Sequence, residues 1–285
     1  MKDNKELFSE VLDKLQGLDN REYDYFHSAQ KLIPSRKEII SVLKNIQCIM
    51  FPDYFYMEEN RGKSPFGILH GIYEALTEQI TAAYAFCSTC EDTAPDAQKL
   101  AGEIISLIPD IKEKLIKDVQ AIYEGDPAAR APEEVILSYP GFYAISIYRI
   151  AHEFYIRNIP YIARLMTEFA HEKTGIDIHA GATIGEYFFI DHGTGIVIGE
   201  TTTIGNHVRI YQGVTLGAKS FELDENGNPI KGIKRHPDIG NNCIIYANAT
   251  ILGGNTKIGD GSVIGGNVWL TRSVAPGEVV YYNAK

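Results

Sequence analysis

The second half of the chain places an aliphatic residue at every sixth position, which restricts the fold more than any other feature. Six residues suffice for one short strand and one turn, so three such units close a triangular coil of about 18 residues. Stacked coils direct the aliphatic side chains into one continuous core. The repeat consists of Ile178, Ile184, Ile190, Ile198, Ile204, Ile210, Leu216, Ile239, Ile245, Ile251, Ile258, Ile264 and Leu270. So many regular positions argue against chance spacing in an ordinary β-sheet protein.

The first half of the chain instead shows the three- and four-residue spacing of helices. Stretches of this kind cover 66–87, 96–108, 110–124 and 140–173, with prolines between them. We therefore predict an α+β protein with two parts. An all-helical N-terminal domain is expected over 1–174, followed over 175–285 by a left-handed parallel β-helix of hexapeptide repeats.

The repeat has one long interruption and two short ones. The stretch 217–234 is polar and rich in Gly, Asn and acidic residues, which predicts a loop extruded from one corner. Steps of eight residues after Ile190 and of seven after Ile251 predict small insertions at corners. The helical half is expected to cap one end of the solenoid, and the tail from Ser273 part of the other.

Composition excludes several classes of protein. The 285 residues carry a formal net charge of −10, whereas general nucleic-acid binding rests on cationic surface. No apolar run approaches the roughly 18 residues of a membrane span, and the mixed-charge start does not resemble a signal peptide. Four cysteines form no disulfide framework, so we expect a reduced, cytoplasmic protein. Cys87 and Cys90 are interpreted as two helix residues.

The densest polar cluster lies in the first coils and comprises Asp177, His179, Asp191 and His192. Asp177 and His192 are 15 residues apart, which places them near one corner in adjacent layers about 4.8 Å apart. A carboxylate there could hold one imidazole nitrogen and leave the other as a base. The alternative is a corner of the coil whose polar side chains are hydrogen-bonded to one another and have only a structural role. Four ionisable residues in so short a stretch make this alternative less favoured.

Two other segments are candidates for substrate binding. Arg235 and His236 lie at the end of the extruded loop. An arginine there is suited to binding a carboxylate or a phosphate group. An equally favoured alternative is a basic turn that is simply exposed to solvent. Asp126 precedes Pro127 and is most simply a turn, although it could face the first coils and hold an ammonium group. The coil histidines have no His-x-x-x-x-His spacing, so we predict no metal site.

Several segments together resemble the serine O-acetyltransferase family over roughly residues 120–280. They are DPA at 126–128, YPGFYAISIYRIAH at 139–152, GIDIHAGATIG at 175–185, IDHGTGIVIGETTTIG at 190–205, YQGVTLG at 211–217 and RHPDIG at 235–240. The resemblance implies transfer of an acetyl group from acetyl-CoA to the hydroxyl of L-serine, in cysteine biosynthesis. Acetyl-CoA is then a co-substrate, and no prosthetic group is needed.

The resemblance also implies roles for individual residues. His192 is expected to be the general base, oriented by Asp177, while Asp126 and Asp191 hold the substrate ammonium and neighbouring groups. Arg235 is expected to bind the substrate carboxylate, with His236 beside it. In the family the active site lies between neighbouring β-helices of a trimer, so Arg235 and His236 are expected to bind substrate in the active site of the next subunit. Coenzyme A is expected along the groove between prisms, against Gly217, Ala218, Ala247, Gly265 and Gly266.

The partners implied are L-serine, acetyl-CoA and L-cysteine, the last as a feedback inhibitor that competes for the serine site. A homotrimer or a dimer of trimers is expected, with residues 1–110 as a candidate oligomerisation region. Many members carry a C-terminal tail ending in isoleucine that docks into O-acetylserine sulfhydrylase. This chain ends at Lys285, which leaves that complex open.

Two alternatives to this function remain at this point. The acetyl acceptor could instead be homoserine or an amino sugar, although Asp126, Asp191 and Arg235 beside a histidine favour an amino acid. A non-catalytic scaffold would need neither His192 nor Asp177.

Overall fold

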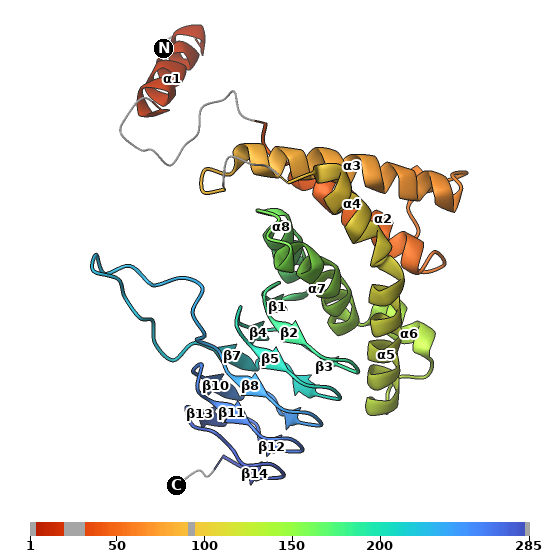
Figure 1. Ribbon diagram of the computed structural model, residues 1–285, viewed down its shortest axis with the longest axis vertical. Coiled ribbons are helices and arrows are strands. Elements are labelled where there is room, and N and C mark those ends of the chain that lie inside the picture. Colours follow the sequence, from red (N-terminus) through yellow and green to blue (C-terminus); the bar gives the residue numbers. More distant parts are fainter. Residues whose placement is uncertain (1–3, 20–31, 91–94, 283–285) are drawn as a thin grey trace.

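The computed structural model describes residues 4–19, 32–90 and 95–282, and its helices from residue 36 onward are stacked on one end of a β-solenoid (Figure 1). The last three residues, on which the sulfhydrylase prediction rests, lie outside the described residues. The helices are α1 (Asn4–Asp19), α2 (Arg36–Met50), α3 (Pro65–Phe86), α4 (Ala97–Ser106), α5 (Ile108–Gly125), α6 (Pro132–Ser138), α7 (Pro140–Ile156) and α8 (Ile162–Thr174).

Local sequence explains where several helices begin and end. Ser35 and Ser64 accept hydrogen bonds from backbone N–H groups in the first turns of α2 and α3, as N-cap residues do. α8 ends at Gly175, which has the left-handed conformation common after a helix. The stretch 140–173, predicted as one helix, is divided into α7 and α8 by a turn that contains Pro160.

The predicted β-helix is confirmed. Its strands are β1 (Asp177–Ile178), β2 (Thr183–Ile184), β3 (Phe189–Asp191), β4 (Val197–Ile198), β5 (Thr203–Ile204), β6 (Arg209–Tyr211), β7 (Thr215–Gly217), β8 (Asp238–Ile239), β9 (Ile244–Ile245), β10 (Thr250–Leu252), β11 (Lys257–Ile258), β12 (Val263–Ile264), β13 (Trp269–Leu270) and β14 (Val279–Val280). They form the three faces of a prism. The face made of β1, β4, β7, β10 and β13 is called sheet A below.

Strand register stacks the six-residue repeat as predicted. On sheet A, Ile178 pairs with Ile198, which pairs with Leu216, and the column continues through Ile251 to Leu270. All five side chains are buried, so the aliphatic positions form a continuous core along the prism. The stretch 217–234 leaves the solenoid after β7 as the predicted loop (Figure 1).

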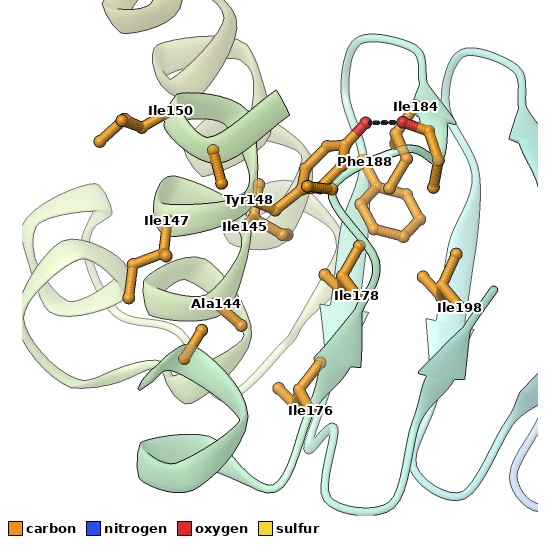
Figure 2. Packing of buried hydrophobic residues seen from close by; sticks show 14 of the residues in the cluster. Ala144, Ile145, Ile147, Tyr148, Ile150, Ile176, Ile178, Ile184, Phe188 and Ile198 are labelled. Atoms are coloured by element: carbon orange, nitrogen blue, oxygen red, sulfur yellow. Dashed lines mark hydrogen bonds between the residues drawn. The ribbon is translucent and has the colours of Figure 1, made fainter. Parts of the chain in front are cut away.

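The helical part shares its hydrophobic core with the first coil. Figure 2 shows Ile145 and Tyr148 of α7 facing Ile178 and Phe188, and the Tyr148 hydroxyl donates to the carbonyl of Ala182 over 2.6 Å. A side chain on Gly141 would lie 2.6 Å from the carbonyl oxygen of Ile190, so only glycine lets α7 approach β3 this closely. The division into separate domains at residue 175 therefore stays a prediction.

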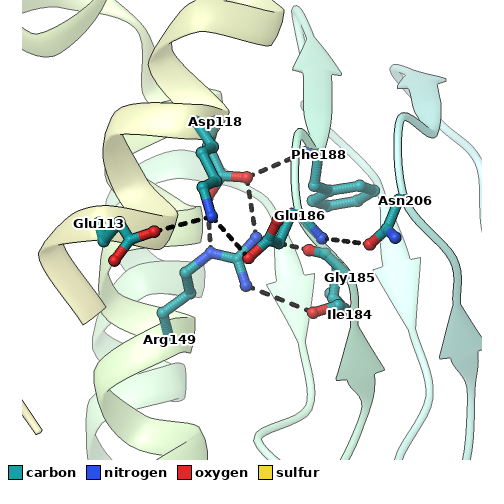
Figure 3. A network of polar contacts seen from close by, with 9 residues as sticks. Glu113, Asp118, Arg149, Ile184, Gly185, Glu186, Phe188 and Asn206 are labelled. Carbon is teal, nitrogen blue, oxygen red and sulfur yellow. Dashed lines mark hydrogen bonds and ion pairs between the residues drawn. The ribbon is translucent and has the colours of Figure 1, made fainter. Parts of the chain in front are cut away.

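A buried ion pair also fixes the helices to the first coil (Figure 3). The Nε of Arg149 donates to Asp118 over 2.5 Å and its Nη2 does so over 2.8 Å; Nη2 also donates to the carbonyl of Gly185 over 2.7 Å. Asp118 in turn accepts from the N–H of Phe188 over 2.9 Å. α5, α7 and the corner before β3 thus hold fixed positions relative to one another.

One expectation about the cysteines is wrong. Cys87 caps the C-terminus of α3 and forms a disulfide with Cys90, so the pair does not lie within a helix as two free thiols. The chain leaves the helix after Phe86, and the turn that follows brings the sulfur atoms together. The cytoplasmic location stays a prediction. Within the described residues, no helix combines the length and apolarity needed to cross a membrane.

Candidate active site

His192 lies where the chain turns from β3 into sheet A. The two extra residues of the eight-residue step are at this corner, and both His192 and Gly193 adopt positive φ angles, 56° and 97°. Positive φ angles recur at other turns of the solenoid, at Tyr187, His207, Asn242, Asn248 and Asn267, so the conformation belongs to the coil corners and does not by itself mark a functional position. The imidazole is 74% exposed, so it is accessible to a ligand.

One acidic residue lies close to this histidine, and a second lies in the neighbouring layer of the solenoid. The Nε2 of His192 is 3.8 Å from the Oδ1 of Asp191, the last residue of β3. Asp177 opens β1 in the layer above, and its N–H bonds to the carbonyl of Ile196 in the His192 corner. In the described part of the chain the acidic side chain within 4 Å of the His192 ring is that of Asp191, and no hydrogen bond joins the side chains of Asp177 and His192. The orienting role of Asp177 therefore stays a prediction.

Asp126 lies on the same side of the molecule, at the C-terminal end of α5. Its Oδ2 accepts from the hydroxyl of Tyr139 over 2.6 Å, and its Oδ1 accepts from the N–H of Ala128 over 2.8 Å. These two hydrogen bonds lower the pKa of Asp126, and its electrostatic interactions with His192 and Arg209 lower it further. The carboxylate is thus ionised, within electrostatic range of the histidine, and suited to an ammonium group.

Sequence reasoning did not identify Tyr139 or Arg209 as parts of this region. Tyr139 lies within a quoted family segment, but nothing local indicates that its hydroxyl reaches Asp126. Arg209 stacks on Phe189, with its guanidinium carbon 4.6 Å from the ring centroid. A side chain on Gly125 would collide with both, so the glycine before Asp126 lets the end of α5 meet the coil.

Arg235 and His236 lie at another corner, where the loop returns to the solenoid. A side-chain oxygen of Glu200 pairs with the Nη2 of Arg235, and its other oxygen accepts from the hydroxyl of Tyr155 over 2.6 Å. Burial raises the pKa of Glu200, but the hydrogen bonds from Tyr155 and Arg235 outweigh it, and the net pKa is lowered. Glu200 lies in a quoted family segment, although sequence reasoning gave it no role.

His236 is held as a neutral imidazole. Its Nδ1 accepts from the N–H of Thr201 over 3.1 Å, which leaves Nε2 to carry the proton. Burial, followed by the positive charge of Arg235, lowers the pKa of His236 to about 4. A side chain on Gly199 would lie about 2 Å from the ring, so this glycine makes the space that His236 fills. The residue can therefore donate a hydrogen bond from Nε2 near neutral pH.

The two groups of residues lie on opposite sides of sheet A. The corners that lead into its strands, 192–196, 212–214, 246–249 and 265–268, form what we call the leading edge. The corners that follow its strands, 179–182, 199–202, 218–237 and 253–256, form the trailing edge. His192 belongs to the leading edge, whereas Arg235 and His236 belong to the trailing edge. One chain therefore does not bring the predicted residues into one site.

The residues predicted to touch coenzyme A divide in the same way. Ala247, Gly265 and Gly266 lie along the leading edge, below His192, and the carbonyl of Ala247 accepts from the N–H of Asn267 over 2.9 Å. Gly217 and Ala218 begin the loop on the trailing edge. At the base of that loop is a cavity of about 250 Å³, lined by Lys219, Lys234 and Arg235 among others. Among the described residues no cluster of His, Cys, Asp and Glu could hold a metal ion.

Comparison with known proteins identifies relatives over most of the chain. A sequence family described as "Serine acetyltransferase, N-terminal" matches residues 74–146, so the resemblance extends further toward the N-terminus than the segments quoted above. A curated protein of Synechococcus elongatus, "Serine acetyltransferase, plasmid", is 44% identical over 260 residues, which are 87% of this chain and 81% of the relative.

Solved structures show the same likeness in three dimensions. The structure of Entamoeba histolytica serine acetyltransferase 1 in complex with L-cysteine matches with a TM-score of 0.74 and 36% identity, over 96% of this chain and 97% of that one. A serine acetyltransferase in complex with CoA matches with a TM-score of 0.57 and 27% identity, over 87% and 94% of the two chains.

Proposed function

The chain belongs to the serine acetyltransferase family, and from that premise we propose that it transfers the acetyl group of acetyl-CoA to the hydroxyl of L-serine. The products are O-acetylserine and CoA. The observation that carries the proposal is the arrangement of an accessible histidine on one edge of sheet A, with the carboxylate of Asp126 within its electrostatic range, and an arginine on the other edge.

We assign the proton transfers to His192. A serine hydroxyl is a weak nucleophile until a base accepts its proton, and the exposed imidazole of His192 can do so. The serine oxygen then attacks the thioester carbonyl carbon, the carbon–sulfur bond breaks, and the imidazolium returns its proton to the departing thiolate. Asp191, 3.8 Å away, stabilises the imidazolium, and Asp177 is proposed to orient the ring in the assembled site.

Recognition of serine follows from the charge at the end of α5 and the charge on the trailing edge of sheet A. Asp126 is proposed to bind the ammonium group, because its hydrogen bonds keep it ionised. Arg235 is proposed to bind the carboxylate, with the Nε2–H of His236 as a further donor. L-Cysteine carries the same ammonium and carboxylate groups, so we propose that it competes for this site. The crystallised complex of the Entamoeba relative with L-cysteine supports this assignment.

Contact between two different edges determines the kind of assembly. When the leading edge of one copy meets the trailing edge of the next, the interface is head-to-tail, and such an interface forms a closed ring when the rotation between neighbours closes, as 120° does for three copies. We propose a homotrimer in which His192 of one copy works with Arg235 of its neighbour. Val197 and Trp269, 39% and 69% exposed on the outer face of sheet A, offer apolar surface for this contact. Residues 1–110 are proposed to join trimers.

Acetyl-CoA is proposed to lie in the groove between two such prisms. Its backbone contacts would come from Ala247, Gly265 and Gly266 on the leading edge and from Gly217 and Ala218 on the trailing edge. The lysines around the loop cavity offer charge for its phosphates, despite the acidic net charge. The CoA complex of a relative with the same fold supports this role.

Release of free thiol from acetyl-CoA tests the reaction directly. Purified protein is incubated with L-serine, L-homoserine, glucosamine or no acceptor. Release that depends on L-serine is the expected result. Release with another acceptor would overturn the substrate assignment. If the folded protein releases no thiol with any acceptor, the result would favour the alternative of a non-catalytic scaffold protein.

A further inference from the structure

Cys87 and Cys90 form a disulfide at the end of α3, where the sequence predicted two helix residues. The sequence also predicts a cytoplasmic protein, and a disulfide in that compartment is usually transient, with a catalytic or redox-sensing role. The other two cysteines of the chain, Cys48 and Cys243, are free and only 7% and 0% exposed. Cys87 and Cys90 are each half-buried, so of the four cysteines this pair is the one that a reductant can reach.

We propose that Cys87 and Cys90 are a reversible redox site, which a dithiol opens and a small disulfide closes again. The state of this site determines how firmly α3 supports the turn between α7 and α8, which borders the trailing edge of sheet A. The consequence for L-serine binding rests on the proposed function, whereas the redox site itself does not.

The exchange needs no cofactor. A thiolate of the dithiol attacks one sulfur of the pair, the S–S bond breaks, and the other cysteine leaves as a thiolate and takes up a proton. The second thiol of the reductant then attacks the mixed disulfide and releases the remaining cysteine, which also takes up a proton. Two electrons thus pass to the protein, and the dithiol becomes its own disulfide. A low-molecular-weight disulfide reverses these steps.

The position of the pair favours sensing over catalysis or a structural cross-link. The reactive cysteines of dithiol oxidoreductases are activated at helix N-termini, where the helix dipole stabilises a thiolate. Cys87 instead lies at the C-terminal end of α3, where the dipole has the opposite sign. The bond also joins residues only three apart in sequence, and a short loop gains less stability from a cross-link than a long one. The bond can therefore open without unfolding the protein.

The last turn of α3 packs directly on the turn between α7 and α8. The ring of Phe86 lies edge-on to the ring of Tyr161, with centroids 5.5 Å apart. The hydroxyl of Tyr84 donates to the carbonyl of Asn158 over 3.2 Å. Cys87 follows directly, and its N–H donates to the carbonyl of Tyr84 over 3.2 Å. Because the disulfide fixes the residue that ends the helix, opening it lets this last turn fray more readily.

The turn between α7 and α8 depends on support from its surroundings. Tyr161 has φ 63° and ψ −39°, a combination outside the left-handed region that some non-glycine residues adopt. Such a conformation costs energy and persists where neighbouring contacts hold it. Phe86 supplies one of these contacts. When the end of α3 frays, the turn is freer to relax, so this turn responds to the redox state of the pair.

The same turn borders the trailing edge. Ile159, Pro160 and Tyr161 line a cavity of about 320 Å³, and His179 of the trailing edge is part of the same lining. Relaxation of the turn changes this packing, so the edge that carries Arg235 is then less firmly held. The opened form is therefore expected to bind L-serine less tightly than the disulfide form.

Thiol labelling tests the redox site without reference to activity. The purified protein is treated with iodoacetamide before and after incubation with dithiothreitol under native conditions, and mass spectrometry locates the labels. We expect no label before reduction and labels on Cys87 and Cys90 after it, with Cys48 and Cys243 unlabelled. Oxidised glutathione should then protect the pair again. The proposal is wrong if dithiothreitol leaves the pair unlabelled or if oxidised glutathione does not close it.

Steady-state kinetics test what the site controls. Reduction is expected to raise the KM for L-serine roughly fivefold. The KM for acetyl-CoA should stay within about twofold. The reductant is removed under anaerobic conditions before the assay, because its thiols would react with acetyl-CoA. A variant with both Cys87→Ser and Cys90→Ser should show the higher serine KM with and without reduction. Equal serine KM values for the oxidised and reduced wild type would overturn the regulatory role.

Phe86→Ala tests the route by which the site acts. It should raise the serine KM of the oxidised protein, and reduction should then change that KM little, because both act through one contact. Phe66→Ala, at a 77% exposed position of the same helix, is the matched control and should behave as wild type. If reduction raises the serine KM of Phe86→Ala as much as that of wild type, the route through Tyr161 is wrong.

Amide hydrogen exchange separates this inference from the proposed function. Reduction is expected to speed exchange over residues 156–162 and to leave the coils beyond residue 238 unchanged. Faster exchange in a protein that consumes no acetyl-CoA with L-serine would support the redox site and refute the proposed function. Unchanged exchange over 156–162 would overturn the inference even where L-serine is the acetyl acceptor.

Discussion

The hydroxyl of Tyr139 donates to the Oδ2 of Asp126 over 2.6 Å, which joins the start of α7 to the end of α5 beside the proposed catalytic histidine. Hydrogen bonds to charged groups contribute more than neutral ones, and this one is the largest cause of the lowered pKa of Asp126. The tyrosine therefore keeps the carboxylate ionised and in place for an ammonium group.

Replacing Tyr139 with phenylalanine should weaken serine binding. We expect the KM for L-serine to rise up to roughly tenfold, equivalent to about 1.4 kcal/mol, from loss of one charge-assisted hydrogen bond. Initial rates at varied L-serine and saturating acetyl-CoA measure this. Tyr123→Phe, on an exposed part of α5, is the control and should behave as wild type. A wild-type serine KM in Tyr139→Phe would show that Asp126 does not need this donor.

The buried pair of Asp118 and Arg149 should dominate the stability of the junction between the helices and the coil. Arg149→Met leaves the fully buried Asp118 without a counter-ion, so the free energy of unfolding should fall by about 3–5 kcal/mol. Urea denaturation measures the difference. Arg36→Met, which breaks an exposed pair with Glu172, should cost less than about 1 kcal/mol. Similar losses in the two variants would contradict the structural role of the buried pair.

Stability should depend on pH through His236. Its pKa falls from the ordinary 6.5 to about 4 in the folded protein, so the unfolded chain binds more protons between these values. The free energy of unfolding should therefore be highest above pH 6.5 and fall as the pH is lowered toward 4. This one group contributes a slope of at most about 1.4 kcal/mol per pH unit.

Urea denaturation from pH 4.5 to 7.5 tests this dependence. His236→Asn should flatten the slope, although part of it should remain, because burial also lowers the pKa of His179. His70→Asn, at an exposed position on α3, should leave the slope unchanged. The inference of a neutral, buried His236 fails if wild type and His236→Asn lose stability equally over this range.

The sequence predicted the solenoid well because its information is local and repeated. Each aliphatic residue of the Ile178 column needs only the same partner one coil away, so spacing alone determines the core. The eight-residue step likewise predicted the insertion that carries His192. The family segments supplied the candidate residues, and the resemblance implied that Arg235 and His236 serve a neighbouring subunit, which stays a prediction. Spacing alone did not show that these two residues and His192 lie on opposite edges of sheet A.

Contacts between distant elements could not be predicted in this way. Asp118 and Arg149 are 31 residues apart on separate helices, and no periodicity relates them to the carbonyls of the first coil. Tyr155 and Glu200 are 45 residues apart, and their contact depends on how α7 packs against the solenoid. The Cys87–Cys90 disulfide was missed because helical spacing was extended past the actual end of α3.

The central claim is that one active site needs His192 from one copy and Arg235 from its neighbour. His192→Ala should lower kcat on the order of 10²–10⁴-fold, by loss of the base. Arg235→Ala should leave little activity at low L-serine, by loss of the carboxylate contact. A trimer built from one variant alone therefore carries the substitution in all of its active sites and should have little activity at low L-serine.

Mixed trimers of these two variants provide the most direct test. The chains are co-expressed with different tags, trimers that carry both are purified, and thiol release is assayed at low L-serine. Each mixed trimer has one interface where an intact His192 meets an intact Arg235, so we predict about one third of wild-type activity. Activity no greater than that of the separate variants would show that the two residues do not act across the interface and would contradict the account.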